Sequence, residues 1–194
     1  MGQYYLPVLG NDSGSKFKVF NRHVDDEYEG AKLMEHSWWN NPFVNSFAAQ
    51  LYNRKCRVLW VGDYATDSND FKFVNCSAKS TPNYRDVWNE NVRAIGLRST
   101  KFTLDNKFLL NHDTKQFVDL NEYKAASLDE DGWAIHPLPL LTAVGNDRGM
   151  GDFHEGGVGY EYVGTWAWHL ISIADKAPKR FEEFKLTFKE RRPQ

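Results

Sequence analysis

The chain has 194 residues, a formal net charge of −2 with its histidines neutral, and 41% hydrophobic and 15% aromatic residues. A chain of this length is most simply one domain, 1–194, and this aromatic content excludes intrinsic disorder. The charge gives no broad basic field, so nucleic acid is not an expected partner. No apolar run is long enough to cross a membrane and no signal peptide is visible, so we expect a cytoplasmic protein without a membrane partner.

The two cysteines, Cys56 and Cys76, form neither a disulfide framework nor a metal-ligand pattern. Cys56 adjoins an apolar run, which predicts a buried thiol and fits a reducing compartment. The C-terminal stretch 176–192 is locally basic, and a solvated strand face explains it better than a nucleic-acid arm. Its last residues, 189–194, are predicted to form a frayed basic tail.

Two strands are predicted at the N-terminus, over residues 3–9 and 16–22. Between them, the sequence Gly-Asn-Asp-Ser-Gly at 10–14 is typical of a turn. In the second strand Phe17 and Val19 alternate with lysines, as on a strand that is buried on one face only.

The clearest helix is predicted over residues 41–54. Asn41 can cap it, Pro42 suits its first turn, and the apolar side chains that follow recur on one face. The next apolar run, 58–61, has no polar face and ends at Gly-Asp. It predicts a central strand that is covered on both sides, with the helix packed on the sheet.

The rest of the chain is less regular. Its most convincing element is a hairpin whose strands, 108–110 and 116–120, flank a turn at 111–115. The other predictions are a short helix around 86–94, a helical turn and loop over 121–133, an extended segment at 135–141 that Pro137 and Pro139 impose, and strands over 163–173 and 184–188. Because helix is scarce and strands follow one another, these elements predict an α+β fold with a mostly antiparallel or mixed sheet.

A glycine-rich loop at 145–159 is the best candidate for a functional site. It holds six of the chain's 14 glycines. Glycine at this density lets backbone turn sharply or approach a ligand closely. The polar residues between the glycines are Asn146, Asp147, Arg148, Asp152, His154 and Glu155. A solvated hairpin loop is the alternative, although loops of this length are usually functional or disordered.

What the loop binds stays open. A phosphate cradle requires a helix after the glycines, and here a strand is predicted to follow. One arginine against three carboxylates also repels a bare phosphate, although Gly149 and Gly151 could offer backbone N–H donors. Asp152, His154 and Glu155 have the residue types of a divalent-metal site, and no other cofactor is indicated.

Other candidate residues lie outside the loop. Glu35 and His36 precede the predicted helix, and His36 has a structural role or takes part in acid–base chemistry. Asp63 and Tyr64 follow the central strand, where a turn or a cleft-lining role is expected. Trp166 and Trp168 alternate along a predicted strand, so they would share one face, as core residues or as an aromatic clamp for a planar ligand.

Five segments together resemble an uncharacterised family of small bacterial and phage-encoded proteins that begin Met-Gly-Gln-Tyr-Tyr. The segments are 1–5, 31–37, 60–65, 135–142 and 145–152, and the resemblance spans most of the chain. The family has no assigned activity, so no catalytic role carries over. The resemblance implies a cytoplasmic protein, including one from a mobile element, and makes the five segments candidates to converge on one site.

The sequence is consistent with three functions. The first is a protein that binds a small polar ligand, including a nucleotide-derived host signal that a phage protein would sequester, through the loop, Glu35, His36, Asp63, Tyr64 and the two tryptophans. The second is an inhibitor or adaptor that docks its acidic loop on a basic protein surface. The third is a hydrolase of a nucleotide or phosphoester that uses His36, Asp152 or His154, with or without a metal.

Overall fold

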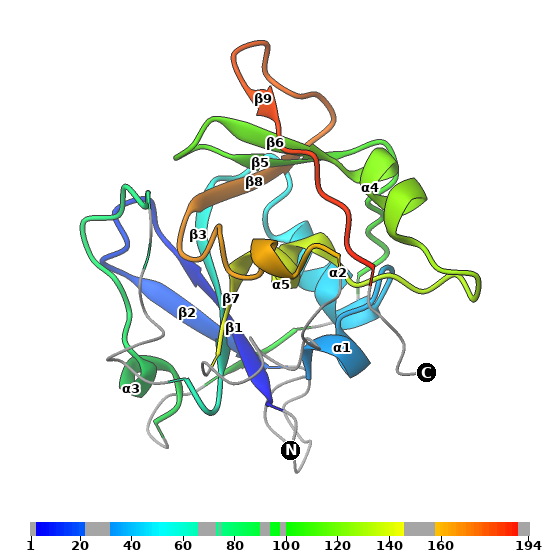
Figure 1. Ribbon diagram of the computed structural model, residues 1–194. Coiled ribbons are helices and arrows are strands. Elements are labelled where there is room, and N and C mark those ends of the chain that lie inside the picture. The colour runs from blue at the N-terminus through cyan, green and yellow to red at the C-terminus, as the bar shows by residue number, and fades with distance from the viewer. Residues whose placement is uncertain are drawn as a thin grey trace.

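The computed structural model describes residues 3–21, 32–65, 73, 75–89, 94–97, 100–145 and 158–189. These residues form an α+β fold around one nine-stranded mixed sheet in which antiparallel pairs predominate (Figure 1). The strand order is β4-β2-β1-β3-β8-β5-β6-β9, and β7 pairs with β3 beside this path. The predicted fold class is therefore confirmed.

The strands are β1 (Tyr5–Gly10), β2 (Phe17–Asn21), β3 (Cys56–Gly62), β4 (Ile95–Gly96), β5 (Phe108–Asn111), β6 (Gln116–Asp119), β7 (Ala143–Val144), β8 (Leu170–Ala174) and β9 (Glu182–Glu183). The helices are α1 (Leu33–His36), α2 (Pro42–Ala49), α3 (Tyr84–Val87), α4 (Leu120–Ser127), α5 (Pro137–Thr142) and the short 3-10 helix η1 (Tyr160–Tyr162). None of the described helices is long and apolar enough to cross a membrane.

Both predicted hairpins are confirmed. β1 pairs with β2 in the register Val8↔Val19, and β5 pairs with β6 in the register Leu109↔Val118. In the second hairpin the turn is organised by Asn111, whose Oδ1 accepts hydrogen bonds from the amides of Asp113 and Thr114. A short Asx turn of this kind fixes the register of a hairpin from local sequence alone.

The predicted amphipathic helix is α2, which ends at Ala49, five residues earlier than expected. Asn41 caps it as predicted, because its Oδ1 accepts hydrogen bonds from the amides of Phe43 and Val44 at 2.9 and 3.2 Å. The apolar face packs on β3, where the rings of Phe47 and Trp60 meet edge-on at 5.0 Å between centroids. The N-cap and the packing against β3 therefore both stabilise α2, as the sequence pattern indicates.

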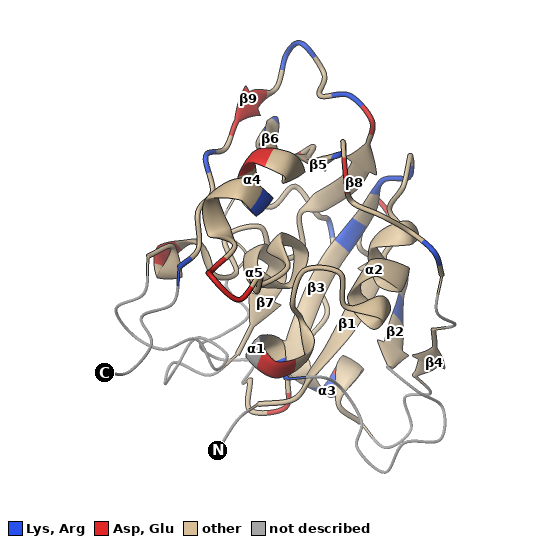
Figure 2. Cartoon of the chain, turned by 90° about the vertical axis from the view of Figure 1, so that its right-hand side faces the viewer, with Lys and Arg blue, Asp and Glu red and all other residues tan. Residues whose placement is uncertain are grey.

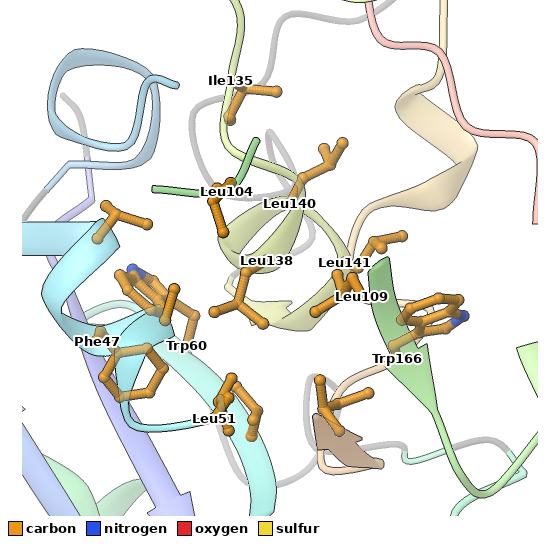
Figure 3. Close-up of a cluster of buried hydrophobic side chains, with 14 of the residues drawn as sticks. Phe47, Leu51, Trp60, Leu104, Leu109, Ile135, Leu138, Leu140, Leu141 and Trp166 are labelled. Carbon is orange, nitrogen blue, oxygen red and sulfur yellow. The ribbon is translucent and has the colours of Figure 1, made fainter. Parts of the chain in front are cut away.

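The central strand β3 is buried on both faces, as its unbroken apolar run predicts. Val58 and Trp60 belong to the core that α2 and α5 cover, whereas Leu59 and Val61 belong to a second core on the other face. Figure 3 shows the first core, in which Leu138 reaches from α5 toward Trp60.

The prediction for 135–141 is wrong: the segment is not extended but holds most of α5, which ends at Thr142. Proline disfavours the helical region for the residue before it, yet it is tolerated in the first turn of a helix, where amide hydrogens have no intrahelical acceptor. His136 takes the extended conformation that Pro137 demands, and its Nδ1 accepts the amide hydrogen of Leu138 at 3.0 Å as the N-cap. The two prolines therefore begin the helix instead of preventing it.

His136 makes folding sensitive to acid. The side chain is 1% exposed, and burial lowers its pKa from 6.5 to about 3. Between these two pH values the unfolded chain binds one more proton than the folded chain, so stability falls as the pH falls from 6.5 toward 3. From pH 6.5 to about pH 4.5 this residue should remove about 2–3 kcal/mol from the free energy of unfolding.

Urea unfolding of wild type and His136→Asn at about pH 7 and about pH 4.5 tests this expectation. Asparagine keeps an N-cap acceptor but cannot titrate, so the loss of stability between the two pH values should be smaller in the variant. His112, whose pKa burial lowers to about 4, supplies part of the loss that remains. An equal loss in the two proteins would mean that His136 does not stay neutral in the fold.

The last predicted strands also differ from the structure. Residues 163–168 form turns, and only Leu170–Ala174 is a strand, β8. Tryptophan and alanine in alternation resemble a strand locally, but Gly164 and Trp168 have φ values of +71° and +59°, which no strand permits. The final strand is β9, two residues before the predicted 184–188 stretch.

A buried ion pair holds the β5–β6 turn to β3. The side chains of Arg57 and Asp113 are 2% and 3% exposed, and Arg57 Nη1 donates to Asp113 Oδ2 at 2.5 Å. Arg57 also donates to the carbonyls of Asp12 and Trp168 and to Ser77 Oγ. Asp113 accepts from the amide and hydroxyl of Ser77 at 3.0 and 2.7 Å, so both charges have several partners.

The surface charges are mixed. Figure 2 shows basic positions along the loop that leads to β9, with acidic positions on β9 itself. The exposed basic residues of this loop are Lys176, Lys179 and Arg180.

Candidate functional site

The end of β3 brings several of the predicted site residues together. β7 runs parallel to β3 in the register Trp60↔Ala143 and Val61↔Val144. The two strands therefore end at the same edge of the sheet, where Asp63 and Tyr64 follow β3 and Gly145 follows β7. The start of the glycine-rich loop thus lies beside Asp63, as the first functional hypothesis requires.

Asp63 fastens the first described residues to the end of β3. Its Oδ1 accepts the amide hydrogen of Tyr4 at 3.1 Å, and its own amide donates to the carbonyl of Tyr4 at 2.9 Å. Its carbonyl accepts from the hydroxyl of Tyr84 at 3.0 Å, and burial followed by the charge of Asp63 raises the pKa of that hydroxyl. These bonds give Asp63 a structural role, while Tyr64 is 46% exposed.

Glu35 and His36 lie on α1, and Lys32 links them to Tyr4, which Asp63 holds at the end of β3. The ammonium group of Lys32 is 2.8 Å from Glu35 Oε1 and 5.8 Å from the centre of the Tyr4 ring. His36 Nδ1 accepts the amide hydrogen of Lys32 at 3.0 Å, which supports a structural role for His36. Four of the five segments that carry the family resemblance thus meet, since Ser37 also accepts the amide hydrogen of His136.

Residues 146–157 of the loop lie outside the described part of the chain. This holds for Asn146, Asp147, Arg148, Gly149, Gly151, Asp152, His154 and Glu155. Their roles in binding ligand, metal or partner stay predictions. Within the described ranges, no group of three or more His, Cys, Asp or Glu side chains could hold a metal ion.

Trp166 and Trp168 do not share a face, contrary to prediction. Trp166 belongs to the core that α2 and α5 cover, and Trp168 belongs to the core on the opposite face. Residues i and i+2 share a face only in a strand, and residues 163–168 form turns instead, so the two side chains point to opposite faces of the sheet. Trp168 is fully buried and its Nε1 donates to the carbonyl of Ser80 at 2.9 Å, so it cannot act as a clamp with Trp166.

Trp166 instead lines a cavity of about 580 Å³ that sequence reasoning did not find. The cavity lies between the β5–β6 turn, the turn after η1 and the residue that follows β9. We call it the Trp166 cavity, and its lining residues are Asn75, Thr114, Gln116, Glu161, Tyr162, Val163, Gly164, Thr165, Trp166, His169 and Phe184. They come from four segments far apart in the sequence, so no local motif marks them.

Aromatic rings make one corner of the Trp166 cavity. Phe184 meets Tyr162 at 5.2 Å between centroids and an interplanar angle of 75°, and meets Trp166 at 5.3 Å and 47°. The rings are inclined to one another and pack against each other, not as a parallel stack. Trp166 is 2% exposed, so it supports the corner from beneath, and the half-buried rings of Tyr162 and Phe184 face the cavity.

Backbone hydrogen bonds to α5 hold the turn that carries Trp166. The amide of Gly164 donates to the carbonyl of Leu140 at 2.9 Å, and the amide of Trp166 donates to that of Leu141 at 2.7 Å. Gly164 has φ +71°, and a Cβ there would lie 2.4 Å from the carbonyl oxygen of Ala143. Only glycine permits this close approach.

The polar lining includes a histidine in a defined orientation. His169 Nδ1 lies 2.8 Å from Asn111 Nδ2. Because Asn111 Oδ1 accepts two backbone amides, its amide nitrogen must face the ring, so Nδ1 is the acceptor. In its neutral form His169 therefore carries its proton on Nε2.

Glu161 is the one charged residue among those that line the Trp166 cavity. The nearest lysines in the sequence are engaged elsewhere. Lys115 donates to the carbonyl of His112 at 2.7 Å and lies over the Phe181 ring. Lys185 pairs with Glu122 at 2.7 Å and also with Glu183. The cavity thus combines aromatic walls, neutral polar groups and one carboxylate.

Comparison with known proteins gives no further assignment: no family model matches the chain, and neither a curated protein nor a solved structure is significantly similar to it.

Proposed function

We propose that the protein binds a small organic molecule in the Trp166 cavity. The observation that carries this proposal is a space of about 580 Å³ with aromatic rings at one corner and polar side chains around the rest of its lining. Small-molecule sites are typically concave spaces of about 300–1,000 Å³ with a mostly apolar lining and few polar groups. The residues that meet there are held by hydrogen bonds within the fold, which favours a preformed site.

The lining favours a neutral or cationic ligand over a phosphate. No Lys or Arg belongs to the part of the lining that the structure describes, and the carboxylate of Glu161 repels an anion. A nucleotide-derived ligand, the hypothesis drawn from the sequence, would thus be bound through its base or ribose. Among the described residues, nothing specifically favours the adaptor or the hydrolase.

The test is a thermal-shift screen with nucleosides, organic amines and quaternary ammonium compounds, with nucleotides as the anionic comparison. At least one neutral or cationic compound at millimolar concentration should raise the melting temperature, because a ligand that binds only the folded state stabilises it. Thr165→Trp should abolish this rise, since Thr165 is an exposed lining residue and indole would fill the space.

Thr81→Trp is the matched control, because Thr81 is exposed and does not line the cavity. This variant should keep the shift of the wild-type protein. Two results would contradict the proposal: no shift with any compound, or a shift that survives in Thr165→Trp.

A further inference from the structure

We propose that the Trp166 cavity selects organic ammonium ions, with Glu161 as the counter-charge and the half-buried rings of Tyr162 and Phe184 as the surfaces against which the cation lies. This inference rests on the proposed function and names the chemical class of its ligand. It follows from the arrangement of rings and from the balance of charge, which are independent observations.

Two half-buried aromatic rings of the lining, Tyr162 and Phe184, offer a surface for a cation. An aromatic face is the negative end of the ring quadrupole and attracts a cation within about 6 Å of its centre. Phe184 packs against Tyr162 at 5.2 Å and against Trp166 at 5.3 Å, centroid to centroid, so a cation does not enter between these rings. It lies against the parts of Tyr162 and Phe184 that remain exposed to the cavity.

The charge balance points to the same class. Glu161 lies directly beside Tyr162 in η1 and has no ion-pair partner among the residues that the structure places. The ammonium groups of Lys115 and Lys185 are held by other acceptors, so they do not neutralise it. A cation that leaves water for this cavity thus meets a carboxylate and aromatic faces, whereas an anion meets the same carboxylate and no positive side chain among the described lining residues.

The neutral polar groups fit a ligand that also carries a hydroxyl or amide. Gln116 and Thr165 belong to the lining and are not fully buried, so their polar atoms can pair with a ligand. A hydroxyl or amide on the ligand would replace the water that these groups lose when the cavity is filled.

Calorimetric titration with choline and with 3,3-dimethyl-1-butanol tests the charge requirement. The two molecules have nearly the same shape and hydroxyl, but carbon replaces the charged nitrogen in the second. Choline should bind about threefold to thirtyfold more tightly, the range expected for a cation at aromatic faces. The preference should decrease as salt is added, because part of it is a charge interaction near the surface.

Glu161→Gln should weaken choline binding severalfold and leave the binding of the neutral alcohol unchanged. Glu161 is exposed, so the isosteric amide should not disturb folding. Glu130→Gln is the matched control: it removes an equal charge from an exposed residue outside the cavity lining and should leave both affinities as in the wild type.

The outcomes separate this inference from the function on which it rests. Equal affinity for choline and the alcohol would overturn the cation class but leave a small-molecule site in place. No binding of choline would likewise overturn it, and the thermal-shift screen would then decide the proposed function alone. A choline preference that Glu161→Gln does not reduce below the Glu130→Gln control would overturn the assignment of Glu161.

Discussion

Replacing Asp113 with alanine is expected to lower the free energy of unfolding by about 3–5 kcal/mol, because it removes the buried counter-charge of Arg57 and leaves only the exposed carboxylate of Asp12, 3.8 Å away. Arg57 is 2% exposed and lies on β3, the most central strand of the sheet. Asp113 supplies its carboxylate at 2.5 Å, and Ser77 also loses its partner when that carboxylate is removed. The large effect comes from the charge that remains, not from the strength of the pair itself.

Urea denaturation of Asp113→Ala, compared with Asp105→Ala, measures this effect. Asp105 pairs with Lys124 but its side chain is 53% exposed, so its loss should cost less than about 1 kcal/mol. The double variant Arg57→Met, Asp113→Leu removes both charges and should be more stable than Asp113→Ala alone. If the free energy of unfolding falls by a similarly small amount in Asp113→Ala and Asp105→Ala, the guanidinium of Arg57 is solvated in the variant and the expectation is contradicted.

The same pair should contribute to acid unfolding. Burial alone would raise the pKa of Asp113, but the hydrogen bonds from Ser77 and Arg57 outweigh it and lower the pKa below its usual value. A carboxyl group with a lowered pKa stabilises the fold above its unfolded-state pKa, and this contribution is lost as the pH falls through the folded-state value. Asp113→Ala should therefore unfold with a weaker pH dependence below about pH 4 than the wild type.

Replacing Trp168 with alanine is expected to lower the free energy of unfolding by about 3–5 kcal/mol, because it would leave a cavity in the core. The ring is fully buried on the second face of the sheet. It meets Phe17 edge-on at 6.3 Å, and a ring atom lies 2.5 Å from the position that a Cβ on Gly10 would take. Its Nε1 hydrogen bond to Ser80 would be lost as well.

Thermal unfolding of Trp168→Ala and of Trp133→Ala distinguishes a core role from a general aromatic effect. Trp133 is only partly buried at the edge of the first core, so its removal should cost clearly less. Because Trp168 does not line the Trp166 cavity, the folded variant should keep the ligand affinity of the wild type. If Trp168→Ala remains folded but loses ligand affinity, Trp168 contributes to the binding site and the expectation is contradicted.

Elements whose signals are local were predictable from the sequence. Asn41 and Pro42 marked the start of α2, and the turn at 111–115 set the β5–β6 hairpin. The apolar run at 58–61 correctly indicated a strand buried on both faces. In each case the residues that determine the element lie within it, so tertiary contacts add to the local preference and do not oppose it.

The errors arose where a local signal has two meanings. Pro137 both excludes a helix before itself and favours one after itself, and the N-cap bond of His136 decides between the two. The alternation at 166–168 is typical of a strand, but the positive φ of Gly164 belongs to a turn that only the contact with α5 requires. The contact with α5 cannot be seen from the neighbouring residues alone, and His136 is not one of the residue types that usually mark an N-cap in a sequence.

The candidate site was predictable only in part. Asp63, Glu35 and the start of the glycine-rich loop do lie around the end of β3, as their positions after strands and before a helix indicated. The Trp166 cavity was not foreseen, since Thr114, Glu161 and Phe184 are brought together by strand pairing over long separations. Of its eleven lining residues, only Trp166 had been singled out as a ligand contact.

The indole N–H signals of the seven tryptophans give the most direct test of the binding site. Of these residues only Trp166 lines the cavity. In proton–nitrogen correlation spectra, titration with choline or with a compound that passes the thermal-shift screen should move the Trp166 signal most and leave that of Trp168 in place. A titration that shifts other indole signals while that of Trp166 stays fixed would contradict binding in the Trp166 cavity.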